Sequence, residues 1–189
     1  MLRVECDLVG VSPVSFSKAV QSVKNKGENH DKFEDRTWME RLHVDAKNQA
    51  FIPAMALKNT LSAAAKFRSE KIPGRGQETY TKNFEVGIMV VDNIMLGVDK
   101  SKVKGERVFV PANGKRGGGS RVWKTFPIIP EWSGHAIIHV IDPVLIENSE
   151  KVKEYLDLAG QLIGLLRFRP RNNGYYGRFR VENFRVMKS

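Results

Sequence analysis

The residue types best suited to chemistry gather in one segment, residues 164–185, which reads GLLRFRPRNNGYYGRFRVENFR. Arginines alternate there with aromatic residues, and Gly174 and Gly177 lie between them. A guanidinium group binds phosphate through paired hydrogen bonds, an aromatic ring stacks on an unpaired base, and glycine lets a ligand approach the backbone closely. The pattern predicts a site for single-stranded nucleic acid, with a cationic surface hairpin as the alternative. The residues predicted to form the site are Arg167, Arg169, Arg171, Tyr175, Tyr176, Arg178 and Arg180.

Two other places carry positive charge where a phosphate would bind. Lys58 falls just inside the start of an expected helix, where backbone N–H groups favour an anion; a solvated surface lysine is the alternative. The glycine-rich loop 113–121 belongs to the stretch NGKRGGGSRVWK, whose glycines suit a backbone nest for phosphate. Its cations are Lys115, Arg116, Arg121 and Lys124. The loop matches neither the Walker A nor the Rossmann pattern, so nucleotide hydrolysis is not expected, and an ordinary hairpin tip is the alternative.

Histidines next to acidic residues offer an alternative based on acid–base chemistry. His30 with Asp31, or His43 with Asp45, would supply an acid–base pair for cutting RNA at its 2′-hydroxyl. His135 and His139 would lie on one face of a strand about 13 Å apart, too far to share a metal ion. The acidic residues near His30 lack the spacing of metal ligands, so neither a metal nor a cofactor is expected. The expected function is binding without catalysis, and a metal-independent endoribonuclease is the first alternative.

The overall charge indicates a polyanionic partner. The chain of 189 residues has 31 basic against 21 acidic residues, a formal net charge of +10. Such an excess favours nucleic acid first and an anionic membrane second, but no apolar run approaches the ~18 residues that span a bilayer. The first residues lack the order of a signal peptide, and the lone Cys6 has no partner for an internal disulfide. We therefore expect a cytoplasmic protein without membrane association.

Hydrophobic periodicity predicts an α+β fold. Strands are expected at 2–11, 84–92, 106–110, 121–129, 135–141 and 178–187, and helices at 54–70 and 148–163. Residues 12–48 are highly charged and too long for a simple connection, so they predict an insertion or partner-contacting arm with a short helix around 33–41. The order fits a single domain over residues 1–189. The expected fold is an RRM- or ferredoxin-like antiparallel sheet with two helices on one face and a long charged insertion after the first strand.

Two motifs resemble the RAMP superfamily of CRISPR-associated RNA-binding proteins. The first is FIPAMALKNTLSAAAKF, similar to the superfamily's first-helix motif; the matching residues are Ile52, Pro53, Leu57 and Lys58. The second, GLLRFRPRNNGYYGRF, is similar to its glycine-rich loop before a final strand. The resemblance implies an RRM-derived fold of the effector-complex backbone type, RNA favoured over DNA, and head-to-tail assembly into an oligomer along the strand. A second alternative is a protein-interaction module that joins or mimics a CRISPR effector, or a replication or recombination complex, through the charged arm.

Overall fold

The structure, a computed structural model, describes residues 1–112, 114 and 119–188. Its strands are β1 (Leu2–Gly10), β2 (Val14–Ser15), β3 (Gln49–Ile52), β4 (Ile88–Val90), β5 (Ile94–Asp99), β6 (Lys104–Pro111), β7 (Arg121–Ile129), β8 (Ser133–Val140) and β9 (Phe179–Lys188). Its α-helices are α1 (His30–Thr37), α2 (Ala54–Arg68), α3 (Thr81–Val86), α4 (Pro143–Glu147) and α5 (Ser149–Leu158). Short 3₁₀ turns cover Trp38–Arg41, Lys100–Lys102 and Pro170–Asn172, and a π-helical turn, Ala159–Ile163, extends α5.

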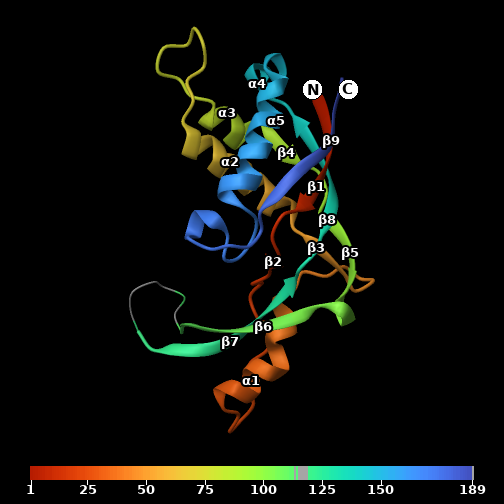
Figure 1. Ribbon diagram of the computed structural model, residues 1–189, viewed down its shortest axis with the longest axis vertical. Helices are drawn as coiled ribbons and strands as arrows, with labels where there is room; N and C mark the ends of the chain where they lie inside the picture. Colours follow the sequence, from red (N-terminus) through yellow and green to blue (C-terminus); the bar gives the residue numbers. More distant parts are fainter. Residues whose placement is uncertain (113, 115–118, 189) are drawn as a thin grey trace.

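The central element is a four-stranded antiparallel sheet in the order β4-β8-β1-β9, with α2 and α5 packed against one face (Figure 1). Helix α2 connects β1 to β4, and α5 connects β8 to β9, which is the ferredoxin-like arrangement. In β1, Leu2, Val4, Cys6 and Leu8 are buried under the helices, while the residues between them lie on the opposite face. We call that opposite face the open face. The predicted α+β class with an antiparallel sheet is confirmed.

A three-stranded sheet, β2-β7-β6, extends away from the central sheet. Its β6–β7 hairpin lies at the lower end of the molecule in Figure 1, with α1 beneath it. A two-stranded sheet, β3-β5, packs beside β8. Gly134 of β8 permits this contact, because a Cβ there would come within 2.3 Å of the Ile94 side chain. The buried side chains of the central sheet, α2 and α5 nevertheless form one continuous core.

Two predicted elements differ from the observed ones. Residues 84–92 form the end of α3 and the short strand β4, which Gly87 separates. A Cβ on Gly87 would lie 2.2 Å from the Asp142 side chain, so only glycine permits this close approach of α3 to the segment that follows β8. The predicted helix 148–163 keeps regular α-helical geometry only to Leu158 and then widens into the π-helical turn. There Gly160 packs against β9, because a Cβ would lie 2.1 Å from the Phe179 carbonyl oxygen.

The charged insertion after β1 is folded onto the β6–β7 hairpin. Trp38 packs against Gly105 of β6, where an added Cβ would approach the indole to 3.0 Å. Glu34 and Arg41 are 1% and 8% exposed and form an ion pair of 2.8 Å. Glu34 also accepts a hydrogen bond of 2.6 Å from the Thr125 backbone N–H, and Arg41 donates one of 3.2 Å to the Thr125 carbonyl. The expected helix is confirmed, and its buried ion pair joins the insertion to β7.

The Glu34→Ala variant should be markedly less stable than the native protein. The substitution leaves the Arg41 guanidinium buried without its carboxylate, and breaking a buried pair in this way costs about 3–5 kcal/mol. Asp35→Ala is the matched control, because Asp35 is the neighbouring exposed carboxylate of α1. Urea unfolding followed by circular dichroism measures both. An equal, small change in both variants would show that the pair does not anchor the insertion.

Candidate nucleic-acid interface

A groove separates the β6–β7 hairpin from the segment 164–177. It consists of two adjoining cavities of about 780 and 280 Å³, which share Arg167 and Pro111 in their walls. The larger cavity is lined by Ser17, Val110, Pro111, Gly114, Arg121, Leu166, Arg167, Phe168, Arg171 and Asn172. The smaller is lined by Ser17, Lys18, Ala19, Val20, Arg41, Pro111, Gly114, Lys124, Phe126 and Arg167. The smaller cavity therefore brings together basic side chains from the insertion, the hairpin and the C-terminal segment, and the larger cavity brings together basic side chains from the hairpin and the C-terminal segment.

The C-terminal segment is held in place by its backbone. Arg167 donates its N–H to the Ser15 carbonyl at 3.1 Å, and Gly177 donates to the Pro13 carbonyl at 2.8 Å. Gly177 has φ of +75°, and a Cβ on it would lie 2.1 Å from the Leu165 carbonyl oxygen. This is a conformation and a spacing that only glycine accepts without strain. The glycines that the sequence marked for ligand approach thus serve first to fold the segment against β2.

Arg167 is partly buried and lines both cavities of the groove. Its guanidinium lies 4.1 Å from the Phe126 ring centroid and 4.5 Å from that of Phe168. Burial, with a smaller contribution from Arg41, lowers the pKa of Arg167. Its Nε is buried without a hydrogen-bond partner in the described part of the chain. Burial removes water from this cation without replacing all of its hydrogen bonds, so binding of an anion beside it is favourable.

Arg169, two residues further along the segment, also has a buried guanidinium nitrogen. Its Nε is also buried and has no hydrogen-bond partner within residues 1–112, 114 and 119–188. Burial, with a smaller contribution from Arg171, lowers the pKa of Arg169. Arg171 is exposed and lines the larger cavity. Arg167 and Arg171 therefore place positive charge on one wall of the groove, and Arg169, which lines neither cavity, lies between them in the sequence.

The opposite wall carries the predicted Lys124 and two cations that the sequence did not reveal. Lys124 donates to the Ala112 carbonyl at 3.3 Å, and burial, followed by Arg41, lowers its pKa. Arg41 and Lys18 both belong to the insertion and reach the same cavity. Sequence reasoning missed these two residues, because nothing in the insertion's mixed charges distinguishes them from solvated side chains. Their position depends on the packing of the insertion against β7.

The two tyrosines differ in what they offer a ligand. Tyr175 is 61% exposed, whereas Tyr176 donates a hydrogen bond of 2.6 Å from its hydroxyl to Glu106 on β6. Burial and this hydrogen bond raise the pKa of Tyr176 to about 12. Its ring packs edge-on against Phe168 with centroids 6.2 Å apart. Tyr175 is therefore the free stacking surface, and Tyr176 ties the segment to the hairpin.

The other predicted binding residues lie in different places. Arg121 lines the larger cavity and donates to the Phe109 carbonyl at 2.7 Å. Arg178 donates to the Gln161 carbonyl at 3.1 Å, and Arg180 pairs with Glu182 at 2.6 Å. The predicted residues Lys115 and Arg116 lie outside the described residues.

Lys58 is engaged within the fold. Its ammonium donates to the Glu85 carbonyl at 2.7 Å, at the end of α3, and to the Ser62 hydroxyl at 2.9 Å. Burial lowers the pKa of Lys58. It contributes to the wall of neither groove cavity. A phosphate bound at Lys58 would have to compete with the carbonyl that the ammonium already holds.

The histidines of the acid–base alternative contact aromatic rings and a backbone carbonyl. His43 lies between Phe16 and Phe51, with ring centroids 6.4 and 5.6 Å away, and burial lowers its pKa. His30 interacts through Nε2 with the Trp123 carbonyl at 3.1 Å. In the described part of the chain, neither histidine forms an ion pair with a carboxylate.

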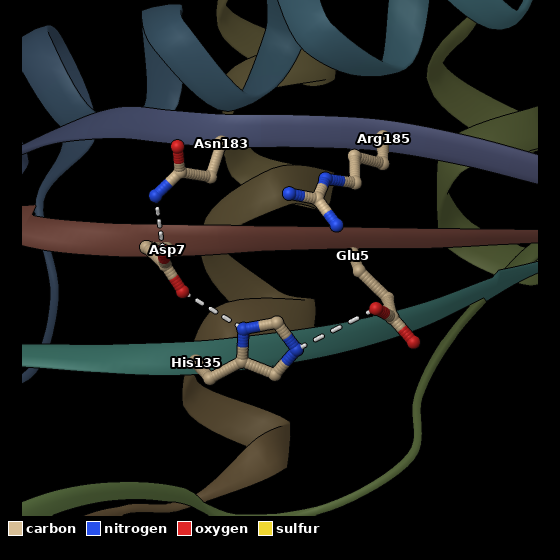
Figure 2. Close-up of a pocket in the computed structure, with 5 residues that line it drawn as sticks. All are labelled: Glu5, Asp7, His135, Asn183 and Arg185. Atoms are coloured by element: carbon tan, nitrogen blue, oxygen red, sulfur yellow. Dashed lines mark hydrogen bonds and ion pairs between the residues drawn. The ribbon is translucent and has the colours of Figure 1, made fainter.

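His135 is the histidine that faces acidic groups. It lies on the open face with Asp7 2.8 Å from Nδ1 and Glu5 3.9 Å from Nε2, as Figure 2 shows. Asn183 and Arg185 of β9 complete this cluster, which lines a separate cavity of about 210 Å³. The sequence showed His135 only as a face residue of a strand, because its partners are far away along the chain.

The chain has an RRM-like α+β fold, and its highly charged insertion forms part of a groove lined by basic residues. No protein-family model matches the chain, and no curated protein matches it. Among solved structures, a chain of Type III-B Cmr-beta bound to cognate target RNA shares the fold with a TM-score of 0.60 and 13% identity. The match covers 99% of this chain and 61% of that one.

A chain of a CRISPR RNA-guided surveillance complex is also similar, with a TM-score of 0.44, 10% identity, and coverage of 95% of this chain and 66% of that one. The Cmr-beta match confirms the predicted resemblance to RAMP proteins at the level of the fold.

Two further features bear on the kind of site present. In the described residues, no helix is long and apolar enough to cross a membrane. Within the same residues, no group of histidine, cysteine and acidic side chains converges in a way that would hold a metal ion.

Proposed function

We propose that the groove binds single-stranded nucleic acid, with RNA favoured over DNA, and performs no chemistry on the strand. The observation that carries this proposal is the pair of buried, unsatisfied guanidinium nitrogens of Arg167 and Arg169. A phosphate that reaches them supplies the missing hydrogen bonds and neutralises a desolvated charge. Lys124 and Arg41 on the facing wall extend the positive field along the groove.

The open face of the sheet is not the surface on which we expect bases to stack. RRM domains stack bases on aromatic residues of the central strands. The corresponding strands here, β1 and β8, present charged, imidazole and aliphatic side chains on that face, among them Glu5, His135 and Ile137. The exposed ring of Tyr175 beside the groove serves as the stacking surface in our proposal.

The structural neighbour supports RNA as the ligand and an assembly as the context. Type III-B Cmr-beta, which shares this fold, is bound to cognate target RNA. In the present chain, β4 and β9 are the edge strands of the central sheet, and β9 spans Phe179–Lys188. Edge strands provide backbone groups for contact with another chain. We therefore propose that protomers assemble along a bound strand.

Replacing Arg167 and Arg169 together by alanine should weaken binding of single-stranded RNA by at least about tenfold for each phosphate that is no longer bound, because hydrogen bonds to charged groups contribute roughly 1.5–3 kcal/mol. The slope of log affinity against log salt should become shallower by about 0.7 for each such phosphate. Fluorescence polarisation with matched single-stranded RNA, single-stranded DNA and duplex DNA at several salt concentrations measures both quantities.

The matched control is the double variant Lys66→Ala, Arg75→Ala. It removes the same formal charge from exposed positions outside the groove. If both double variants lose the same affinity, net charge rather than the groove accounts for binding. If native protein binds none of the three nucleic acids at low salt, the proposed function is wrong.

Tyr175→Ala should lower affinity for single-stranded RNA about fivefold or more, since stacking on an aromatic ring contributes ~1–3 kcal/mol per base. Phe67→Ala is the control, because Phe67 is a similarly exposed aromatic, 65% accessible, on α2 and outside the groove. The same polarisation assay compares the two. Unchanged affinity in Tyr175→Ala would remove stacking from the proposal while leaving the phosphate contacts standing.

Oligonucleotides of increasing length should increase the particle mass in steps of one protomer. The physical reason is that a strand longer than one groove offers a second binding site beside the first, next to an available sheet edge. Multi-angle light scattering with single-stranded RNA of graded length tests this. A single protomer per strand at every length would contradict the assembly.

A further inference from the structure

The outer edge of β6 is a surface that the proposed function does not use. Strand β6 is the edge strand of the sheet β2-β7-β6, and it pairs with β7 from Lys104↔Ile128 to Pro111↔Arg121. In an antiparallel pair, successive residues turn their backbone N–H and C=O groups alternately toward the partner strand and away from it. The residues of β6 that turn away from β7 can therefore be identified from the contacts of β7.

The edge of β7 that faces away from β6 is covered by the insertion. Side chains of the insertion contact the Trp123 carbonyl and bind both the N–H and the carbonyl of Thr125. These two residues thus turn their backbone groups away from β6. Their partners in register, Phe109 and Arg107, must then turn their own backbone groups away from β7.

These outward backbone groups of β6 form a free edge. Among the described residues, the N–H groups of Arg107 and Phe109 and the Arg107 carbonyl have no hydrogen-bond partner. The Phe109 carbonyl accepts a hydrogen bond of 2.7 Å from the Arg121 guanidinium, which therefore lies at the same edge. Arg107 and Phe109 are both exposed. An exposed edge with unpaired backbone groups is a template for a further strand.

One face of this edge is cationic and aromatic. Phe109 and Trp123 lie directly opposite each other, 45% and 47% exposed, with ring centroids 5.2 Å apart. The Arg107 guanidinium lies over the Trp123 ring, 5.7 Å from its centroid, and the Arg121 guanidinium lies over the Phe109 ring at 5.3 Å. Two arginines thus present positive charge on one face of the free edge.

The other face of the edge is mainly apolar. Val108 and Val110 alternate with Arg107 and Phe109 along β6, so their side chains point to the opposite face of the sheet. Glu106 shares that face, but its carboxylate already accepts the hydrogen bond of 2.6 Å from Tyr176. An added strand with acidic side chains on one face and apolar side chains on the other matches both faces of β6.

We propose that β6 docks an extended acidic segment of a partner protein by antiparallel strand addition. The segment alternates acidic with apolar residues and becomes the next strand of the sheet, beside β6. Its carboxylates pair with Arg107 and Arg121, and its apolar side chains pack against Val108. Arg107 now pairs with Asp31 at 3.0 Å, but the two side chains are 47% and 62% exposed. A surface pair of this kind contributes little, so a carboxylate of the partner replaces it.

The chemistry of the edge favours this occupant over two others. A second copy of β6 would bring its own Lys104 and Arg107 against those of the first, and like charges on neighbouring strands repel. A nucleic-acid backbone provides phosphate acceptors but no N–H groups for the Arg107 carbonyl, and a guanidinium already covers one face of each aromatic ring. The docking edge is also separate from the groove, because Arg107 and Phe109 line neither of its cavities.

The test is an NMR titration of the isotope-labelled full chain with a peptide of alternating glutamate and valine, matched to β6 at eight residues. Binding should slow hydrogen exchange of the Arg107 and Phe109 amides, which point to the free edge. Exchange of the Val108 amide, which faces β7, should not change. Absence of peptide binding at low salt overturns the proposal, and so does unchanged exchange at Arg107 and Phe109 in the saturated complex.

Two methylated peptides separate strand addition from simple charge attraction. A residue opposite Arg107 in an antiparallel pair turns its own N–H toward β6, and in the proposed register these residues are the glutamates. Methyl groups on the glutamate nitrogens should weaken binding at least about tenfold, because they remove hydrogen bonds and block close approach. Methyl groups on the valine nitrogens, which point away from β6, should leave affinity unchanged. Equal affinity of the two methylated peptides overturns the proposal.

A charge reversal tests the cationic face. Arg107→Glu should weaken binding of the glutamate–valine peptide about fivefold, because an attractive cross-strand pair becomes repulsive. The same variant should bind a lysine–valine peptide more tightly than native protein does. Arg75→Glu makes the same charge change at an exposed position outside the hairpin and should bind both peptides like native protein. Circular dichroism verifies that both variants are folded. Equal effects of the two variants would attribute binding to net charge and overturn the proposal.

The result is separable from that of the groove. Arg107→Glu should keep the affinity of native protein for single-stranded RNA, since Arg107 lines neither groove cavity. If Arg107→Glu loses more RNA affinity than Arg75→Glu, the edge belongs to the nucleic-acid interface and the docking proposal is overturned. Native protein that binds the acidic peptide but no nucleic acid refutes only the groove.

Discussion

The buried ion pair between Glu34 and Arg41 is the interaction on which the shape of this protein most depends. It joins a highly charged insertion to β7 through both side chains and through the backbone of Thr125. A pair this deeply buried is stable only when its remaining hydrogen-bonding groups are satisfied, and here the edge of β7 satisfies them. The insertion therefore becomes a wall of the groove, and residues as far apart as Lys18 and Arg167 line one cavity.

The C-terminal segment that forms one wall of the groove carries two arginines that differ from their neighbours in hydrogen bonding. Arg41 has its carboxylate, Arg178 has a carbonyl, and Arg180 has Glu182. The Nε atoms of Arg167 and Arg169 are buried, yet they have no hydrogen-bond partner in the described residues. Aromatic faces compensate Arg167 in part, since Phe126 and Phe168 flank its guanidinium. Because these buried cations lack hydrogen-bond partners, an anion that supplies the hydrogen bonds binds with a favourable free energy.

The sequence predicted the fold well wherever local pattern and tertiary contact agree. The alternation in β1 and the alanine-rich α2 determine the sheet and its covering helix, and the alternation of arginine with aromatic residues in the C-terminal segment predicts a cationic site. Other elements depend on contacts that no local pattern records. Gly87 divides one apolar stretch into α3 and β4 because Asp142 packs against it, and Arg41 reaches the groove only because Glu34 is buried.

The polar cluster on the open face, around Asp7 and His135, consists of residues whose proximity cannot be read from the sequence. Asp7 meets His135 and Asn183 across 128 and 176 positions of chain, so their proximity is decided entirely by strand register. That register is itself irregular, because the pairing of β1 with β9 shifts between Glu5 and Asp7. Asn183 lies at the shift with φ of +51°, a left-handed conformation that asparagine tolerates better than most residues. A bulge of this kind redirects a side chain, and here it turns the Asn183 amide toward Asp7. The irregularity in β9 is thus what fixes the carboxylate that orients His135.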